Sequence, residues 1–289
     1  MSYTTVDSPD GTRIRAWCND GEGRPVLLSN GLGTPPGAWP ALADPACGFR
    51  VVSWYQRGLG GSERPADPDR RRVEHHTEDA LAVMDALDVP SALVVGWSLG
   101  VNIAFEIVRQ QPQRTQGVLA VAGVPGGSYE ALFAPLGVPR ALRPKVGRAG
   151  AKLLRVFGPL LPLLTATLPA ARSLPFGLLG PLREVAHTQA LSAVLHEFAA
   201  HDWDWYHDLA VAVGEHAPLD LAASTLPVTV LAGSHDALVD VEHMRDVAAR
   251  LGDARYRELP GTHFLPLQYP QVMLEELRLL AQRVDASRR

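Results

Sequence analysis

A serine flanked by glycines stands in the segment Gly96-Trp97-Ser98-Leu99-Gly100. The segment directly follows the apolar run 92–95 and directly precedes a helical pattern that starts at Val101. A serine on a sharp strand-to-helix turn is held above the sheet, and glycines on either side avoid Cβ clashes. An ordinary turn is the alternative reading, but the flanking strand and helix favour a nucleophile. The helix would also aim free N–H groups, including that of Leu99, at a developing oxyanion.

A serine hydroxyl is a poor nucleophile, so it needs a base, and the base needs an orienting acid. Asp236 follows the predicted strand 228–232, and His263 follows the predicted strand 255–259. Open α/β sheets gather their active sites beyond the carboxyl ends of parallel strands. We therefore expect Ser98, Asp236 and His263 to converge as a catalytic triad.

Neighbouring side chains compete for two of these roles. Asp240 lies four residues after Asp236, and His235 and His243 are the competing bases. The position of His263 after the last predicted strand favours it as the base.

The elements that must position these residues follow from apolar spacing. We predict an opening hairpin, buried strands and amphipathic helices. The hairpin falls at 3–6 and 13–17, the further strands at 25–29, 49–54, 92–95, 118–122, 228–232 and 255–259, and the helices at 77–87, 101–111, 241–251 and 271–284. This alternation predicts an α/β fold with a mostly parallel sheet and helices on both faces.

The alternation stops in the middle of the chain. Residues 131–183 contain eight Lys or Arg and no Asp or Glu, with many Leu and Pro. We expect residues 1–124 and 227–289 to form the core domain and residues 125–226 to form a helical cap. Two interpretations of the cap stay open: a unit with its own small core, or a lid over a lipophilic channel.

The motifs together resemble the α/β-hydrolase family, in its serine-nucleophile, esterase and lipase-like branch. The family's nucleophile elbow corresponds to 96–100, and its acid and histidine to Asp236 and His263. The family's oxyanion loop corresponds to Asn30-Gly31-Leu32-Gly33, and a second signature to 57–62. The resemblance implies the α/β-hydrolase fold, an eight-stranded sheet with a cap between strands six and seven. It also implies that the Leu32 N–H is the second oxyanion donor beside that of Leu99.

Two positions depart from the family pattern. Asn30 stands where many relatives have His, and Tyr55 stands where many have Asp. We therefore expect different hydrogen bonding around the oxyanion loop. Relatives that cleave epoxides or carbon–halogen bonds use Asp at the elbow, so Ser98 argues against those reactions.

The resulting functional hypothesis is a hydrolase that cleaves an ester, thioester or lactone of a lipophilic small molecule through an acyl-enzyme. The alternatives are a carbon–carbon bond hydrolase, a cofactor-free perhydrolase or haloperoxidase-like enzyme, or a non-catalytic ligand sensor. Candidate substrate-binding side chains are Asn30, Trp39, Trp97, Phe133, Phe157, Trp203, Trp205, Tyr206 and Phe264.

Composition narrows the function classes. Hydrophobic residues make up 46% and charged residues 20%, which is ordinary globular composition, and the net charge of -4 argues against nucleic-acid binding. Cys18 and Cys47 are too few for a disulfide framework, and we expect them to be buried or partly buried. His196 and His201 lie five positions apart, about 140° around a helix, which does not suit zinc. We expect no metal and no cofactor.

The N-terminus predicts no secretory signal, because no basic patch precedes an apolar stretch. The apolar run 156–171 contains three prolines and is short for a membrane span. We expect a cytoplasmic protein without stable membrane insertion, and leave surface association of the cap and the oligomeric state open.

Overall fold

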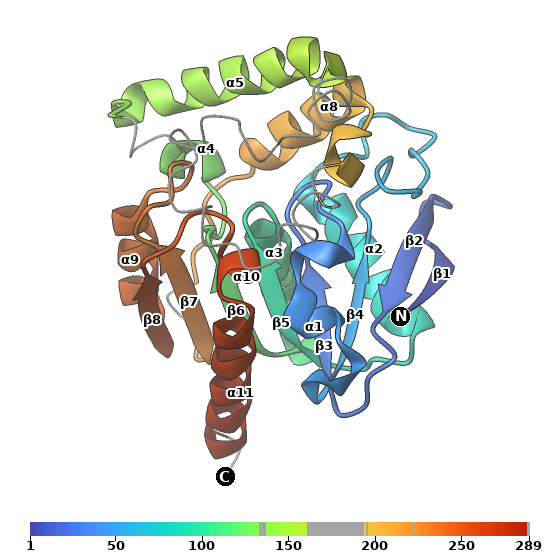
Figure 1. The fold of residues 1–289 in the computed structure, drawn as a ribbon, viewed down its shortest axis with the longest axis vertical. Coiled ribbons are helices and arrows are strands. Elements are labelled where there is room, and N and C mark those ends of the chain that lie inside the picture. The colour runs from blue at the N-terminus through green and yellow to red at the C-terminus, as the bar shows by residue number, and fades with distance from the viewer. Residues whose placement is uncertain (133–136, 161–193, 195, 222–223, 288–289) are drawn as a thin grey trace.

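The computed structural model describes residues 1–132, 137–160, 194, 196–221 and 224–287. Its centre is an eight-stranded sheet in the order β1-β2-β4-β3-β5-β6-β7-β8 (Figure 1). The strands are β1 (Ser2–Asp7), β2 (Arg13–Cys18), β3 (Arg24–Ser29), β4 (Phe49–Trp54), β5 (Ala92–Trp97), β6 (Thr115–Val121), β7 (Val228–Gly233) and β8 (Ala254–Leu259). Among the strand pairs of this sheet, β1–β2 and β2–β4 are antiparallel and the others are parallel. The predicted hairpin and mostly parallel sheet are confirmed.

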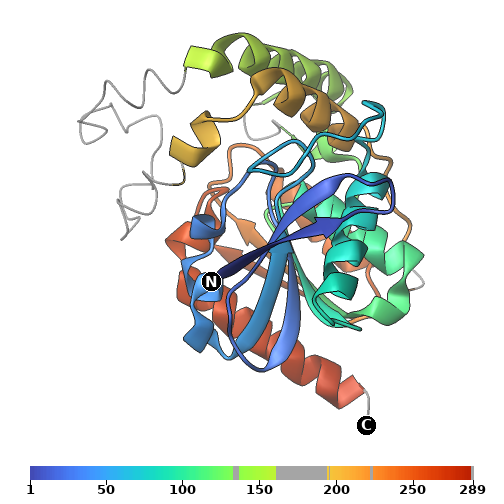
Figure 2. The same cartoon turned by 90° about the vertical axis from the view of Figure 1, so that its right-hand side faces the viewer.

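Helices cover both faces of this sheet (Figure 2). One face packs against α2 (Val73–Ala86), α3 (Gly100–Gln110) and α9 (Val241–Arg250), and the other against α1 (Pro40–Ala43), α10 (Leu265–Gln268) and α11 (Pro270–Ser287). Short 3₁₀ turns occur at η1 (Pro36–Ala38), η2 (Pro45–Cys47), η3 (Pro112–Arg114), η5 (Arg140–Leu142) and η6 (Gly158–Leu160).

The central strand β5 shows why its sequence is apolar throughout. Val94 belongs to the core on the α2 and α3 side, whereas Leu93 and Val95 belong to the core on the α11 side. Successive strand residues point to opposite faces, so a strand buried on both faces shows no polar alternation. This burial fixes the end of β5, and therefore the place of Ser98.

Helix α2 starts four residues before Thr77, so the predicted start of this helix was wrong. It begins at Val73, and the Thr77 hydroxyl lies inside the helix and donates to the Val73 carbonyl at 3.0 Å. The helix start is capped by His75, whose Nδ1 accepts the Arg72 N–H at 3.2 Å. An imidazole in this role is not among the usual capping side chains, so the pattern concealed it.

The segment between β6 and β7 carries α4 (Ser128–Ala131), α5 (Arg143–Phe157) and α8 (Trp203–Gly214). Helices α5 and α8 lie one against the other across the carboxyl ends of the strands (Figure 1). We call the described residues of 125–226 the cap. The domain boundaries themselves stay a prediction.

Acidic side chains from elsewhere neutralise much of the basic charge of α5. Arg143 pairs with Asp240 at 3.2 Å, Arg148 with Glu215 at 2.8 Å, and Arg155 with Asp204 at 2.6 Å. The charge segregation seen along the chain is therefore partly compensated in space.

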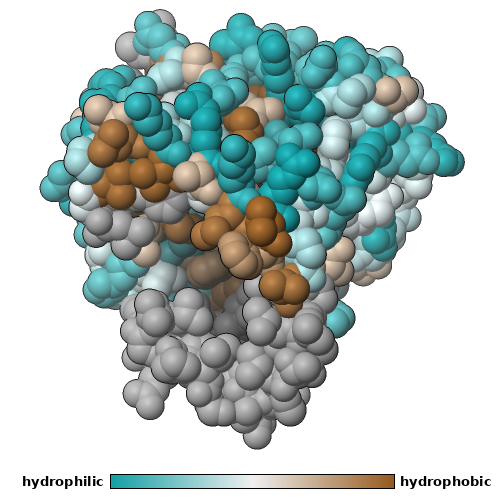
Figure 3. Space-filling view, turned by 90° about the horizontal axis from the view of Figure 1, so that it is seen from above, coloured by the Kyte–Doolittle hydropathy of each residue, from teal (hydrophilic) through white to brown (hydrophobic). Residues whose placement is uncertain are grey.

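The upper surface of the molecule carries apolar side chains among polar ones (Figure 3). The exposed large hydrophobic residues of the cap are Leu142, Leu153, Leu154, Val156, Phe157 and Leu160. Throughout the described part of the chain, every helix is too short or too polar to span a bilayer. Cys47 is buried and Cys18 partly buried, as expected, and both are free thiols.

Candidate active site

Ser98 stands on the turn between β5 and α3 with a φ of +55°. A positive φ is strained for a residue with a side chain and recurs at functional sites. The turn also needs close backbone packing, because a Cβ at Gly100 would lie 2.1 Å from the Ser29 carbonyl oxygen. A Cβ at Gly96 would lie 2.8 Å from the Val101 Cα. Both glycines are therefore required by sterics.

The structure brings Asp236 and His263 to Ser98. The His263 Nε2 lies 2.9 Å from the Ser98 Oγ, and the His263 Nδ1 lies 2.9 Å from the Asp236 Oδ2. Asp236 and His263 are both buried. A carboxylate only accepts, so Nδ1 carries the proton, and Nε2 is left to accept the Ser98 hydroxyl proton.

Backbone groups hold the acid and the base in place. The other carboxylate oxygen of Asp236 accepts the N–H groups of Leu238 at 2.8 Å and Val239 at 3.0 Å. The indole N–H of Trp97 donates to the His263 carbonyl at 3.0 Å. The three functional side chains are thus fixed by the ends of three different strands, β5, β7 and β8.

The competing residues have other partners or positions. Asp240 caps α9 by accepting the Glu242 N–H at 3.1 Å and pairs with Arg143. His235 is exposed, and burial lowers the pKa of His243. Of the two nearby carboxylates, Asp236 is the one that contacts His263.

The loop 30–33 lies against the serine, since a Cβ at Gly31 would come 3.7 Å from the Ser98 Cβ. Leu32 and Leu99 pack in one small apolar cluster, which also contains Leu59. Among the described residues, neither the Leu32 nor the Leu99 N–H has a hydrogen-bond acceptor. Two free backbone donors beside a serine hydroxyl are what an oxyanion hole requires.

The two departures from the family pattern each make their own hydrogen bonds. Asn30 Oδ1 accepts the Trp39 indole N–H at 2.9 Å, and its amide donates to the Thr34 carbonyl at 2.9 Å. The Tyr55 hydroxyl donates to Glu197 of the cap at 2.9 Å. Burial, and then the Glu197 carboxylate, raise the pKa of Tyr55, so the phenol stays protonated. Asn30 therefore closes the oxyanion loop, whereas Tyr55 joins the core to the cap.

The aromatic candidates on the core surround the base. Trp97 lies with its ring centroid 6.0 Å from that of His263, and Phe264 lies 6.0 Å from His263 on an edge-to-face contact. Trp39 packs edge-on against Trp97 at 6.1 Å. Trp39 and Trp97 are buried, and their indole N–H groups are used within the protein.

The aromatic candidates of the cap have different surroundings. Trp203 packs on Tyr206, with ring centroids 5.1 Å apart, and Trp205 donates to the Arg57 carbonyl at 2.8 Å. Phe157 is 54% exposed at the end of α5, and its place in a channel wall stays a prediction. Phe133 lies outside the described residues.

Sequence reasoning missed two polar residues that contact the oxyanion loop, Gln56 and His201. The Gln56 side chain bonds to Asn30, Gly31 and Gly33. His201, whose spacing from His196 does not suit zinc, contacts the Gly33 carbonyl through Nε2 at 2.6 Å. In the sequence, the one indication of a role for Gln56 is its place directly before the second signature at 57–62. No sequence pattern indicates a role for His201 at the loop. Within the described chain, no group of three or more His, Cys, Asp or Glu is arranged to hold a metal ion.

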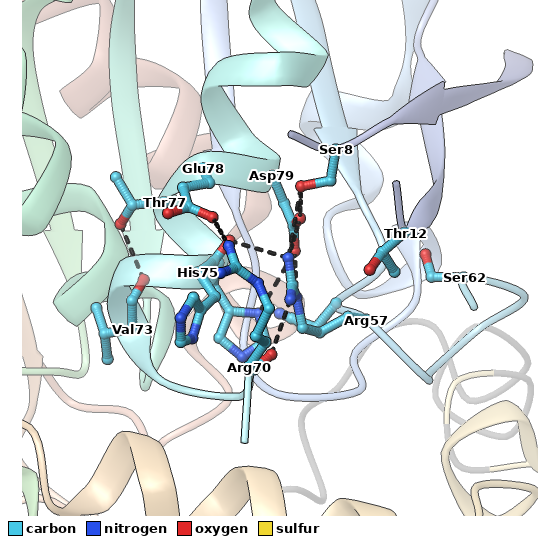
Figure 4. Close-up of polar contacts among 12 residues, drawn as sticks. Ser8, Thr12, Arg57, Ser62, Arg70, Val73, His75, Thr77, Glu78 and Asp79 are labelled. Atoms are coloured by element: carbon cyan, nitrogen blue, oxygen red, sulfur yellow. Dashed lines mark hydrogen bonds and ion pairs between the residues drawn. The ribbon is translucent and has the colours of Figure 1, made fainter. Parts of the chain in front are cut away.

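The second signature is anchored by a buried charge network (Figure 4). The Arg57 guanidinium is fully buried and donates to Asp79 at 2.5 and 2.9 Å and to Asp10 at 2.9 Å. Burial opposes the charge on Arg57, but hydrogen bonds and the charges of Asp79 and Asp10 raise its pKa. Ser8 donates to Asp79 at 2.6 Å. This network fixes the backbone next to Gln56.

Comparisons with known proteins agree with this architecture. The family model for the alpha/beta hydrolase fold matches residues 24–161. RutD of Caulobacter vibrioides, provisionally named a carbamate hydrolase, is 33% identical over 125 residues, which are 43% of this chain and 46% of RutD. The chain thus spans about half the length of the curated relatives it matches.

Solved structures match over nearly the whole chain. Est816, an N-acyl homoserine lactone degrading enzyme, is 25% identical with a TM-score of 0.70, and the match covers 95% of this chain and 99% of Est816. A thermophilic esterase from Thermogutta terrifontis is 19% identical with a TM-score of 0.74, covering 98% of this chain and 99% of the esterase. The elbow, the sheet and these matches together show that the chain has the α/β-hydrolase fold.

Proposed function

We propose that this protein is a serine hydrolase that cleaves an ester, thioester or lactone of a lipophilic small molecule through an acyl-enzyme. The observation that carries the proposal is the unbroken chain of hydrogen bonds from Ser98 through His263 to Asp236, both links 2.9 Å long. A nucleophile and base within hydrogen-bond reach, with the base oriented by a third group, characterise covalent catalysis.

The reaction follows from these positions. As the Ser98 oxygen attacks the acyl carbon, its proton passes to Nε2 of His263, which then donates it to the leaving group. A water molecule next gives a proton to the same nitrogen and attacks the acyl-enzyme, which releases the acid and restores Ser98. Asp236 keeps the Nδ1 proton in place and stabilises the imidazolium that forms in both steps.

The negative oxygen of each tetrahedral intermediate would receive the N–H groups of Leu32 and Leu99. Each such donor contributes about two to three orders of magnitude in rate in well-studied cases. Leu99 directly follows the nucleophile and precedes α3, so its N–H also lies at the positive end of a helix.

The named activities of similar proteins support the same bond class. Est816 degrades a lactone, and RutD carries a provisional name for carbamate cleavage. A lactone and a carbamate each contain an acyl carbon bonded to a heteroatom, and the proposed triad suits attack on such a carbon.

The test combines labelling with turnover. Wild type and Ser98→Ala are compared with a fluorophosphonate probe and with nitrophenyl esters from acetyl to octanoyl, and Ser234→Ala, an exposed serine nearby, is the matched control. We expect Ser98→Ala to lose labelling and about 10⁶ in turnover, as for a triad serine, while Ser234→Ala keeps both. An unlabelled wild type would instead favour a ligand sensor.

A further inference from the structure

We propose that Gln56 and His201 are positioning residues for the oxyanion loop, so that the cap helps to aim the Leu32 N–H at the reacting oxygen. The inference rests on the proposed function and names two side chains that hold its oxyanion loop in place. Gln56 reaches the loop from the core, and His201 reaches it from the cap.

The geometry of one peptide unit shows how Gln56 acts. The Gly31 carbonyl and the Leu32 N–H belong to the same planar peptide and point in opposite directions. The Gly31 oxygen accepts the Thr34 N–H at 3.0 Å and the Gln56 Nε2 at 3.3 Å. Holding that oxygen holds the plane, and the plane sets where the Leu32 N–H points.

The Gln56 side chain also bonds to both ends of the loop. Its Nε2 donates to the Asn30 carbonyl at 3.1 Å, and its Oε1 accepts the Gly33 N–H at 3.1 Å. If the amide were turned over, its NH₂ group would face the Gly33 N–H. Its oxygen would then face the Asn30 and Gly31 carbonyl oxygens. The bonds therefore fix the side chain in one orientation, and Gln56 is buried.

His201 secures the loop from the other side. Its Nε2 donates to the Gly33 carbonyl at 2.6 Å, and its ring stacks on Tyr206. The fit is tight, because a Cβ at Gly33 would lie 2.5 Å from that nitrogen. Burial lowers the pKa of His201, so the neutral ring with a proton on Nε2 makes this bond near neutral pH.

The cap also contacts the backbone beside Gln56. The Trp205 indole N–H donates to the carbonyl of Arg57, the residue next to Gln56. A Cβ at Gly58 would lie 2.0 Å from that indole nitrogen, so the Trp205 ring packs directly against the backbone at Gly58. Displacement of the cap would therefore release the loop at Gly33 and the backbone that carries Gln56.

The experiment compares His201→Leu, which cannot donate, with His201→Gln, whose amide can place an N–H near the Nε2 position. Tyr55→Phe is the control, because it loses the cap bond to Glu197 without touching the oxyanion loop. Each variant is measured for kcat and KM on one nitrophenyl ester and for the Kd of phenylboronic acid, whose tetrahedral adduct places an oxygen in the oxyanion hole. Thermal unfolding checks that each variant is folded.

We expect His201→Leu to lower kcat about tenfold, less than the loss of a whole donor, and to weaken boronate binding by a similar factor with KM little changed. His201→Gln should recover most of both, and Tyr55→Phe should match wild type. Gln56→Met should reproduce the His201→Leu pattern more strongly.

Two results would overturn the inference. One is a His201→Leu protein whose kcat and boronate affinity both stay within twofold of wild type. The other is a rise in KM at constant kcat, which would make His201 a substrate contact. In either case wild type still reacts with the fluorophosphonate, whereas failure of the proposed function leaves wild type itself unreactive.

Discussion

The substitution Asp236→Asn tests the triad at its most buried member. Asp236 Oδ1 accepts two backbone N–H groups, from Leu238 and Val239, while Oδ2 accepts the His263 Nδ1 proton. In the variant, the amide oxygen will keep the two backbone bonds, because a reversed amide would leave both N–H groups unpaired at about 1–3 kcal/mol each. The new NH₂ group then faces His263.

This orientation forces the wrong tautomer. With an NH₂ donor opposite Nδ1, the His263 ring must carry its proton on Nε2, which can no longer accept the proton of Ser98. We expect kcat to fall about 10⁴-fold, as in the serine-protease template, or about 5.4 kcal/mol at 1.36 kcal/mol per decade.

The assay is steady-state hydrolysis of a nitrophenyl ester, with thermal unfolding as a check on the fold. Asp240→Asn is the matched control, because its amide oxygen can still cap α9 by accepting the Glu242 N–H, and it should stay near wild type. A folded Asp236→Asn protein that retains more than a tenth of the wild-type kcat would refute the assigned role of Asp236.

Two further predictions concern stability. His76 is fully buried, and burial, then the charge of Arg57, lower its pKa from 6.5 to about 3. Above pH 6.5 the buried ring is neutral in both the folded and the unfolded chain, and as the pH falls from 6.5 towards 3 the folded state loses stability by about 5 kcal/mol in total. His76→Gln should therefore show a shallower decline in urea midpoint between pH 7 and 4.5, and parallel curves would contradict this. Arg57→Met leaves Asp79 buried without its partner and should cost about 3–5 kcal/mol in urea unfolding, part of which Asp79→Asn should restore in the double variant. A loss of unfolding free energy below about 1 kcal/mol, which is the range of exposed ion pairs, would show that the Arg57–Asp79 pair is effectively solvated.

The sequence was most informative where the structure is local. Strands such as β5 are apolar because both faces are covered, and the sequence of the elbow reflects contacts within a few residues of Gly96 and Gly100. The start of α2 was misplaced because His75 replaces the usual capping side chain. Phe157 is exposed at the end of α5, because apolar character alone does not say which face of a helix is covered.

Long-range polar contacts were beyond the reach of pattern reasoning. The Gly33 carbonyl meets His201 across 168 positions, and Tyr55 meets Glu197 across 142. Neither bond leaves a periodicity or a motif, because one partner is a backbone group or an isolated polar side chain. Of the two departures from the family pattern, Asn30 makes hydrogen bonds within the oxyanion loop, whereas Tyr55 bonds to the cap, and the sequence predicted neither set of partners.

The two halves of the site are therefore supported differently. Ser98, His263 and Asp236, the proposed nucleophile, base and acid, are held by strand ends and by backbone donors such as that of Leu238, all of which belong to the core. The loop that carries the proposed Leu32 donor is held by side chains, one of which belongs to the cap. A ligand that shifts the cap would leave the proton-transfer chain intact and change the stabilisation of the oxyanion. On the proposed hydrolysis, we expect substrates that move the cap to different extents to differ mainly in kcat, with the hydrogen bonds among Ser98, His263 and Asp236 unchanged.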